Sequence, residues 1–232
     1  MRFPPAWRNA FAIAALAPAL TIASGLEASH GLGAVPVQAG TADPQMGLTP
    51  QERADILKGG IIVRDLPNPA RPGKTFEALG SFPGGLDEAY AVITDYRRYP
   101  EFMPRVERVA VRDVNATTSI VEIRLAFPLG QSRQYRLEYR AARSGEGFEI
   151  SWEKLPWPGL PPGQTVKDTS GRWLVRRAGA SGVLAAYLVY SDPGPVPLGL
   201  TGTAQALSKR GLADVIERTR RRIRELFPPD KR

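Results

Sequence analysis

The side chains that carry most enzyme chemistry are scarce in this chain of 232 residues. It has no cysteine, which excludes disulfides, thiolate nucleophiles and cysteine-bound metal clusters. His30 is the one histidine, so a Ser-His-Asp triad has a single candidate base and a multi-histidine metal site is excluded. The sequence contains neither a phosphate-binding glycine loop nor a Gly-x-Ser-x-Gly elbow. We therefore assign no catalytic residue, no metal ligand and no cofactor.

Aromatic side chains are the next group that could form a site. They fall on the apolar side of segments in which apolar and polar residues alternate, a pattern typical of antiparallel strands with one buried face. We expect these side chains to point inward, where they either line a cavity for an apolar ligand or fill a solid core. The members of this set are Tyr135, Tyr139, Trp152, Trp173 and Tyr187.

Residues 1–39 are typical of a targeting segment. Arg2 and Arg8 precede the apolar run Asn9–Ala23, and small residues follow, as in a secretory signal peptide. An uncleaved membrane anchor is the alternative, although the run is short for a span of about 20 residues. We expect a bacterial periplasmic or secreted protein, membrane-anchored if the segment is retained. Cleavage would remove His30 and leave the mature chain without a histidine base.

The elements that must position the aromatic set predict an α+β fold. Residues 40–73 are expected to be an N-terminal extension with a short helix, which starts at the capping box Thr49–Glu52. Residues 74–228 are expected to form the ligand-binding domain, with about six to seven antiparallel strands. Its last segment, Thr203–Phe227, repeats apolar residues at about four-residue spacing, as an amphipathic helix does. The sheet's single apolar face and the helix's single apolar stripe cover each other if the sheet curves around the helix.

One segment carries a family resemblance. Asp95–Pro104 reads Asp-Tyr-Arg-Arg-Tyr-Pro-Glu-Phe-Met-Pro and resembles the Asp-x-x-x-Tyr-Pro-x-Phe-x-Pro segment of polyketide cyclases and coenzyme-Q-binding proteins. These belong to the START-like, or SRPBCC, superfamily, and the resemblance covers roughly Lys74–Phe227. It implies a helix-grip fold, a curved antiparallel sheet around a long C-terminal helix, with a cavity for a hydrophobic molecule. The cavity entrance would then be framed by Tyr96, Tyr99, Phe102 and Met103, unless these side chains merely brace a corner of the fold.

Two further segments could contact a ligand or a membrane. Leu155–Gly163 holds four prolines and Trp157, and is expected to be a lid, an apolar tip that dips into a bilayer, or a loop folded onto the sheet edge. In the C-terminal helix, Leu207 on the apolar stripe is assigned to the ligand site. The arginines of Arg218–Arg224 either bind anionic headgroups or form a solvated face. The net charge of +8 favours anionic partners, but expected export and the lack of a binding motif argue against nucleic acid.

These observations predict an exported, monomeric protein that binds or carries a lipid or isoprenoid-like ligand in an internal cavity. The first alternative is a cofactor-free cyclase or dehydratase that acts on an apolar substrate through a Tyr/Asp pair. The second alternative is an adaptor with a collapsed cavity, whose basic face binds a partner in the cell envelope.

Overall fold

The computed structural model describes residues 46–127, 130, 132–179, 182–194 and 201–228, without the side chains of 201–208. The expected signal segment and His30 lie outside these residues. Within the described part, no helix is both long enough and apolar enough to cross a membrane.

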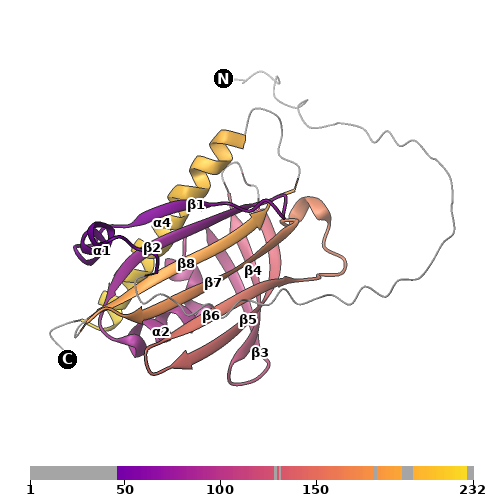
Figure 1. The fold of residues 1–232 in the computed structure, drawn as a ribbon. Coiled ribbons are helices and arrows are strands. Elements are labelled where there is room, and N and C mark those ends of the chain that lie inside the picture. The colour runs from indigo at the N-terminus through magenta and orange to yellow at the C-terminus, as the bar shows by residue number, and fades with distance from the viewer. Residues whose placement is uncertain (1–45, 128–129, 131, 180–181, 195–200, 229–232) are drawn as a thin grey trace, which may run out of the picture. The chain divides into compact units, whose positions relative to one another are not determined.

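One antiparallel sheet of eight strands forms the framework (Figure 1), in the order β1-β2-β8-β7-β6-β5-β4-β3. Its bounds are β1 Ile62–Leu66, β2 Lys74–Pro83, β3 Val106–Asp113, β4 Thr118–Ala126, β5 Ser132–Ser144, β6 Gly147–Leu155, β7 Asp168–Arg177 and β8 Gly182–Asp192. The expected curved antiparallel sheet is confirmed, with one strand more than the six to seven expected. The additional strand is β1, where the sequence indicates a small strand at Ile61–Arg64. It pairs with β2 from Ile62↔Leu79 to Leu66↔Thr75, so part of the N-terminal extension belongs to the sheet.

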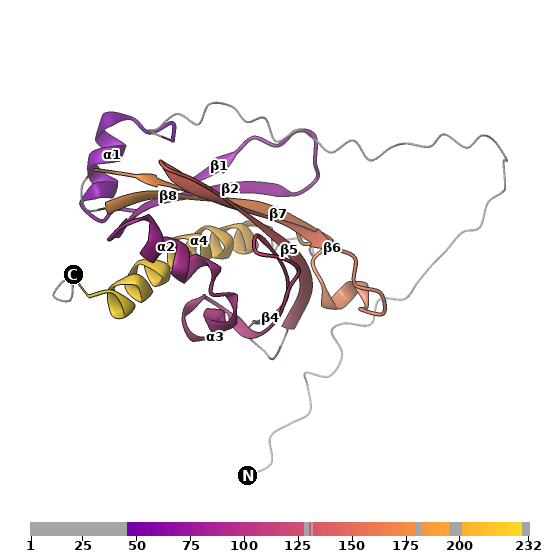
Figure 2. The same ribbon diagram turned by 90° about the horizontal axis from the view of Figure 1, so that it is seen from below.

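The helices lie on both faces of the sheet (Figure 2). On the concave face are α2 (Leu86–Thr94), the short turns η1 (Tyr96–Arg98) and α3 (Tyr99–Phe102), and the long α4 (Thr201–Leu226). On the opposite face is α1 (Pro50–Leu57), which begins with the expected capping box. The Glu52 carboxylate accepts a hydrogen bond from the Thr49 backbone N–H at 2.8 Å, and the Glu52 backbone N–H donates to the Thr49 hydroxyl at 3.2 Å. A sheet gripping a C-terminal helix is the helix-grip arrangement.

Strand alternation divides the apolar residues between two cores. In β2, Phe76, Ala78 and Phe82 face α4 and join the main core, whereas Leu79 faces the other way. Leu79 packs against α1 in a small second core with Leu48, Ile56, Leu184 and Ala186. The extension therefore covers apolar surface that the back of the sheet would otherwise expose to water.

Arg220 corrects the expectation that the helix arginines form one solvated or headgroup-binding face. It is only 4 % exposed, and it donates from Nε to the Ser81 carbonyl at 2.9 Å and from Nη1 to the Gly59 carbonyl at 3.0 Å. Its Nη1 also pairs with Glu217 at 2.7 Å. Arg220 thus fastens α4 to β2 and to the turn after α1, while Arg221 and Arg224 are exposed.

Candidate ligand-binding site

A cavity of about 130 Å³, here called the inner cavity, lies between the concave face of the sheet and α4. Its volume is similar to that of the engineered apolar cavity of about 150 Å³ that binds benzene. Six residues of the predicted ligand set line it: Met103, Tyr135, Tyr139, Trp152, Trp173 and Tyr187. Tyr99 of the family-like segment also lines it, and the lining is completed by residues not predicted from sequence, namely Pro104, Val106, Ile123, Leu125 and Val215.

The aromatic wall of the inner cavity is part of a row of contacting rings that runs across four strands and continues behind the cavity to η1. Tyr96 lies 4.5 Å from Tyr139, measured between ring centroids, and Tyr139 lies 5.7 Å from Trp152. Trp152 stacks on Tyr187 at 5.2 Å, and Tyr187 lies 4.6 Å from Trp173. We call these five residues the aromatic row. Such contacts hold large flat groups in fixed orientations.

A glycine makes room for this row. Gly171 of β7 is the register partner of Trp152, and a Cβ built on it would lie 2.3 Å from Trp152 Cζ2. It would also lie 2.3 Å from the Leu188 carbonyl oxygen, which cannot move away easily. The Trp152 indole can therefore lie flat over the neighbouring strand only because position 171 has no side chain.

Five tyrosines around the cavity are held in the neutral form, because burial raises the pKa of each phenol: Tyr96, Tyr99, Tyr135, Tyr139 and Tyr187. The Tyr99 hydroxyl donates to the Ile93 carbonyl at 2.6 Å. The hydroxyls of Tyr135, Tyr139 and Tyr187 form no hydrogen bond with another described residue. The inner cavity is therefore apolar with a few neutral hydrogen-bond donors.

The remaining predicted residues do not line the inner cavity. Tyr96 and Phe102 are buried in the layer behind it, where Phe102 packs edge-on against Tyr99 at 5.6 Å. Trp157 lines a different pocket. Leu207 lies in α4, but its side chain is outside the described residues.

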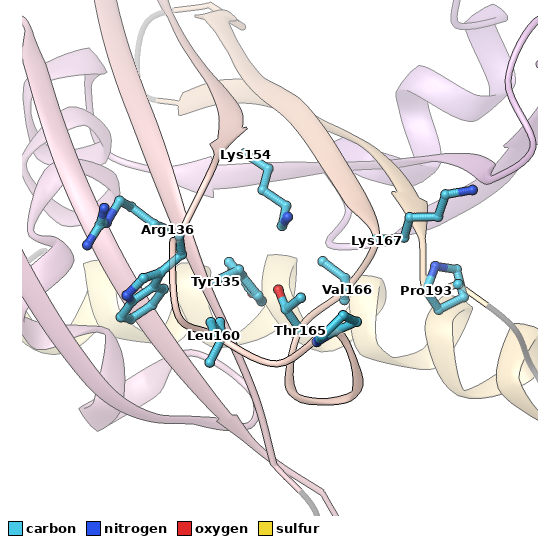
Figure 3. Close-up of a pocket in the computed structure, with 11 residues that line it drawn as sticks. Tyr135, Arg136, Lys154, Leu160, Thr165, Val166, Lys167 and Pro193 are labelled. Carbon is cyan, nitrogen blue, oxygen red and sulfur yellow. The ribbon is translucent and has the colours of Figure 1, made fainter. Parts of the chain in front are cut away.

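A second hollow of about 370 Å³, here called the loop pocket, lies beneath the segment that joins β6 to β7 (Figure 3). Trp157, Leu160 and Pro162 of the proline-rich loop form one side of it, and the ends of β5 and β6 form another. The Arg136 guanidinium lies 4.9 Å from the centroid of Trp157 and holds the indole against the sheet. The loop therefore folds over the ends of the two central strands β5 and β6 and covers a pocket there, rather than lying on an edge strand of the sheet. Tyr135 lines both this pocket and the inner cavity, so the two spaces are neighbours.

Other charged groups near the site are explained by structural contacts. Asp95, considered as a partner of a catalytic tyrosine, is exposed at the end of α2 and does not line the inner cavity. Glu101 pairs with Arg98 at 2.5 Å and with Arg222 at 2.6 Å, which ties α3 to α4. Among the described residues, no three His, Asp or Glu side chains gather as metal ligands.

Comparison with known proteins agrees with this geometry. The family described as polyketide cyclase / dehydrase and lipid transport matches residues 85–202, about half of the chain. The chain is therefore a member of this family within the START-like superfamily. No curated protein matches its sequence.

Solved structures share the fold. The STAR-related lipid transfer protein from Xanthomonas axonopodis (fragment 25–204) is 19% identical with a TM-score of 0.62, over 71% of this chain and 94% of that one. Human StAR-related lipid transfer protein 5 is 12% identical with a TM-score of 0.63, over 72% and 83% of the two chains. The protein TTHA0849 from Thermus thermophilus is 12% identical with a TM-score of 0.54, over 65% and 97%. At these identities the likeness establishes the helix-grip fold.

Proposed function

We propose that this protein binds a hydrophobic molecule of the lipid or isoprenoid class in the inner cavity and carries it outside the cytoplasm. The observation that supports this most directly is the aromatic row facing α4, together with the nearby hydroxyls of Tyr135, Tyr139 and Tyr187, which have no partner among the described residues. Burying an apolar ligand there would contribute roughly 25 cal/mol per Å² of surface removed from water. The proteins that share the fold include lipid-transfer proteins, which is consistent with such cargo.

Ligand capture tests the proposal directly. The protein is expressed with its own N-terminal segment in a bacterium, purified from the envelope, and examined by native mass spectrometry before and after organic extraction. We expect a bound apolar species that extraction removes. Absence of such a species, together with no saturable uptake of fluorescent lipids by the extracted protein, would refute a carrier function.

A cavity-filling variant ties binding to this space. Val215 lines the inner cavity from α4, so Val215→Trp should fill it and abolish uptake. Val114→Trp adds the same indole at a position that is 50 % exposed and should leave uptake unchanged. If Val215→Trp does not fold, Ile123→Phe reduces the same space from the sheet side. Uptake that survives in a folded cavity-filling variant would place binding elsewhere.

A cyclase or dehydratase activity on an apolar substrate is the second candidate, and the three unpaired phenols favour it. Because burial raises their pKa, they would act as proton or hydrogen-bond donors to a substrate carbonyl rather than as bases. Tyr139→Phe separates the two functions. If the wild-type protein turns over a substrate and Tyr139→Phe loses turnover with binding intact, the protein is an enzyme. If neither protein shows turnover and both load the same cargo, it is a carrier.

Contact with an anionic membrane is a further part of the proposal. Arg221 and Arg224 are exposed on α4 and could approach phospholipid headgroups during loading. Vesicle binding that depends on anionic lipid and weakens with salt would support this contact.

A further inference from the structure

The loop pocket contains a lysine on the inner face of the sheet. Lys154 is the register partner of Leu137, a buried residue of the main core, and it follows Phe148, Ile150 and Trp152 at the next inward position of β6. Among the residues that the structure describes, its ammonium lies within ion-pair distance of no carboxylate. A cation placed over an apolar interior gains most from an anionic partner.

The other two cations of this pocket are already engaged. Arg136 donates to Glu122 at 2.6 Å and lies over Trp157, while Lys167 pairs with Asp192 at 3.5 Å. Figure 3 shows the Lys167 ammonium pointing away from the pocket. Among the described residues that line this pocket, Lys154 is therefore the cation that remains available to a ligand.

A second polar group in the pocket also has no described protein partner. The Thr165 hydroxyl oxygen is buried and makes no hydrogen bond within the described structure. Figure 3 shows this hydroxyl and the Lys154 ammonium pointing toward the middle of the pocket. A buried hydroxyl without a hydrogen-bond partner destabilises the protein, and a bound hydrogen-bonding group would remove that cost.

From this arrangement we infer that the loop pocket is a headgroup site for an amphiphile with one anionic head, a carboxylate or a phosphate. Lys154 forms the ion pair and Thr165 donates a hydrogen bond. The apolar chain passes Tyr135, which lines both spaces, into the inner cavity. The walls formed by Trp157 and Leu160 cover the part of the chain nearest the head. This inference rests on the proposed function, because it names the chemical class of the ligand bound there.

A matched pair of ligands and a matched pair of variants test the headgroup site. Extracted full-length protein is titrated with a fluorescent polyene fatty acid and with its methyl ester, which keeps the chain and removes the charge. We expect the acid to bind more tightly. Lys154→Gln should weaken acid binding about tenfold, the size of one charge-assisted hydrogen bond, and leave ester binding unchanged. Lys167→Gln removes the same charge from a lysine that points away, and should change neither.

Competition identifies the head. Displacement of the acid by hexadecanoate or by hexadecyl phosphate, but only weakly by hexadecanol, supports the site and distinguishes carboxylate from phosphate. Displacement by inorganic phosphate alone would indicate a free anion as the ligand and would overturn the amphiphile. Thr165→Val should weaken binding of the acid about tenfold, as expected for one hydrogen bond from a neutral donor to an ionised acceptor.

The two proposals fail in different ways. If the ester binds as tightly as the acid and Lys154→Gln changes neither, the headgroup site is wrong while hydrophobic binding stands. An equal loss of acid binding in Lys154→Gln and Lys167→Gln would indicate a diffuse positive field and also overturn the site. If neither ligand binds the extracted protein, hydrophobic binding itself is refuted for single-chain amphiphiles.

Discussion

Replacing Arg220 tests whether this arginine fastens the gripping helix to the sheet. Arg220→Met keeps an apolar stem of similar length and removes the donors to the Ser81 and Gly59 carbonyls. A hydrogen bond from a charged donor contributes about 1.5–3 kcal/mol. Because Gly59 is exposed, water can replace one of the two bonds, whereas Ser81 is half-buried beneath α4. We expect the free energy of unfolding to fall by about 3 kcal/mol, which lowers Tm by roughly 6–12 °C for a domain of this size.

The matched control is Arg221→Met, one residue further along α4. Arg221 is exposed and pairs only loosely with Glu225, at 3.6 Å, so its replacement should cost less than about 0.5 kcal/mol. Urea unfolding measures the stability of both variants. If their m-values equal that of the wild type, the shift in the unfolding midpoint reports a change in stability. Equal stability of the two variants would refute the anchoring role. A more stable Arg220→Met protein would refute it as well, because replacing a buried charge by an apolar group is sometimes stabilising.

Three further predictions concern packing and titration. Gly80→Ala should destabilise the fold by about 1–3 kcal/mol, because the added Cβ would lie 2.5 Å from Ile216 Cγ2 on α4. The control is Gly182→Ala, whose added Cβ would meet nothing closer than 3.4 Å, and its free energy of unfolding should change little in the same urea assay. Hydrogen bonds from Thr49 and Arg64 lower the pKa of Glu52 to about 2, so they stabilise the fold above about pH 4.5 and are lost as the pH falls toward 2. The free energies of unfolding of the wild type and of Glu52→Gln should therefore converge as the pH falls over that range. A difference between them that stays constant with pH would contradict this. Burial raises the pKa of five of the seven tyrosines, so the free energy of unfolding should fall above about pH 10. Absorbance at about 295 nm should show these five phenols ionising only as the protein unfolds. Reversible ionisation of all seven tyrosines near pH 10 would be inconsistent with the buried cavity.

Alternation along the strands was sufficient to predict the cavity wall. Tyr135 and Tyr139 lie on the same face of one strand, and Trp152 and Trp173 occupy that face of the next two, so a period of two places them all on the concave side. The family-like segment added Met103, which lines the cavity, and Tyr96, which packs behind it. That these residues bind a ligand stays a prediction.

The same periodicity contained signals for residues that were missed. Arg220 lies four residues after Ile216 and three before Ile223, so it occupies the apolar stripe of α4 although it belongs to a run of arginines. Lys154 continues the inward series of β6 by one step. Position alone cannot decide such cases, because a long cationic side chain at an inward site can turn its head back to solvent. The contacts of the charged group in the folded protein decide between two roles. Arg220 binds backbone carbonyls and fixes a helix to the sheet, whereas the Lys154 ammonium has no carboxylate partner among the described residues.

The depth of the inner cavity depends on two glycines whose meaning the sequence does not contain. Gly80 lets Ile216 of α4 approach β2, and Gly171 lets the Trp152 indole lie across β7. A glycine inside a strand indicates that something comes close to the backbone, but it does not say what. Gly80 allows α4 to lie close to β2, and Gly171 allows the Trp152 ring to lie close to β7. The inner cavity lies between this helix and this wall, so its shape depends on contacts between separate elements of the fold, which no local sequence pattern relates.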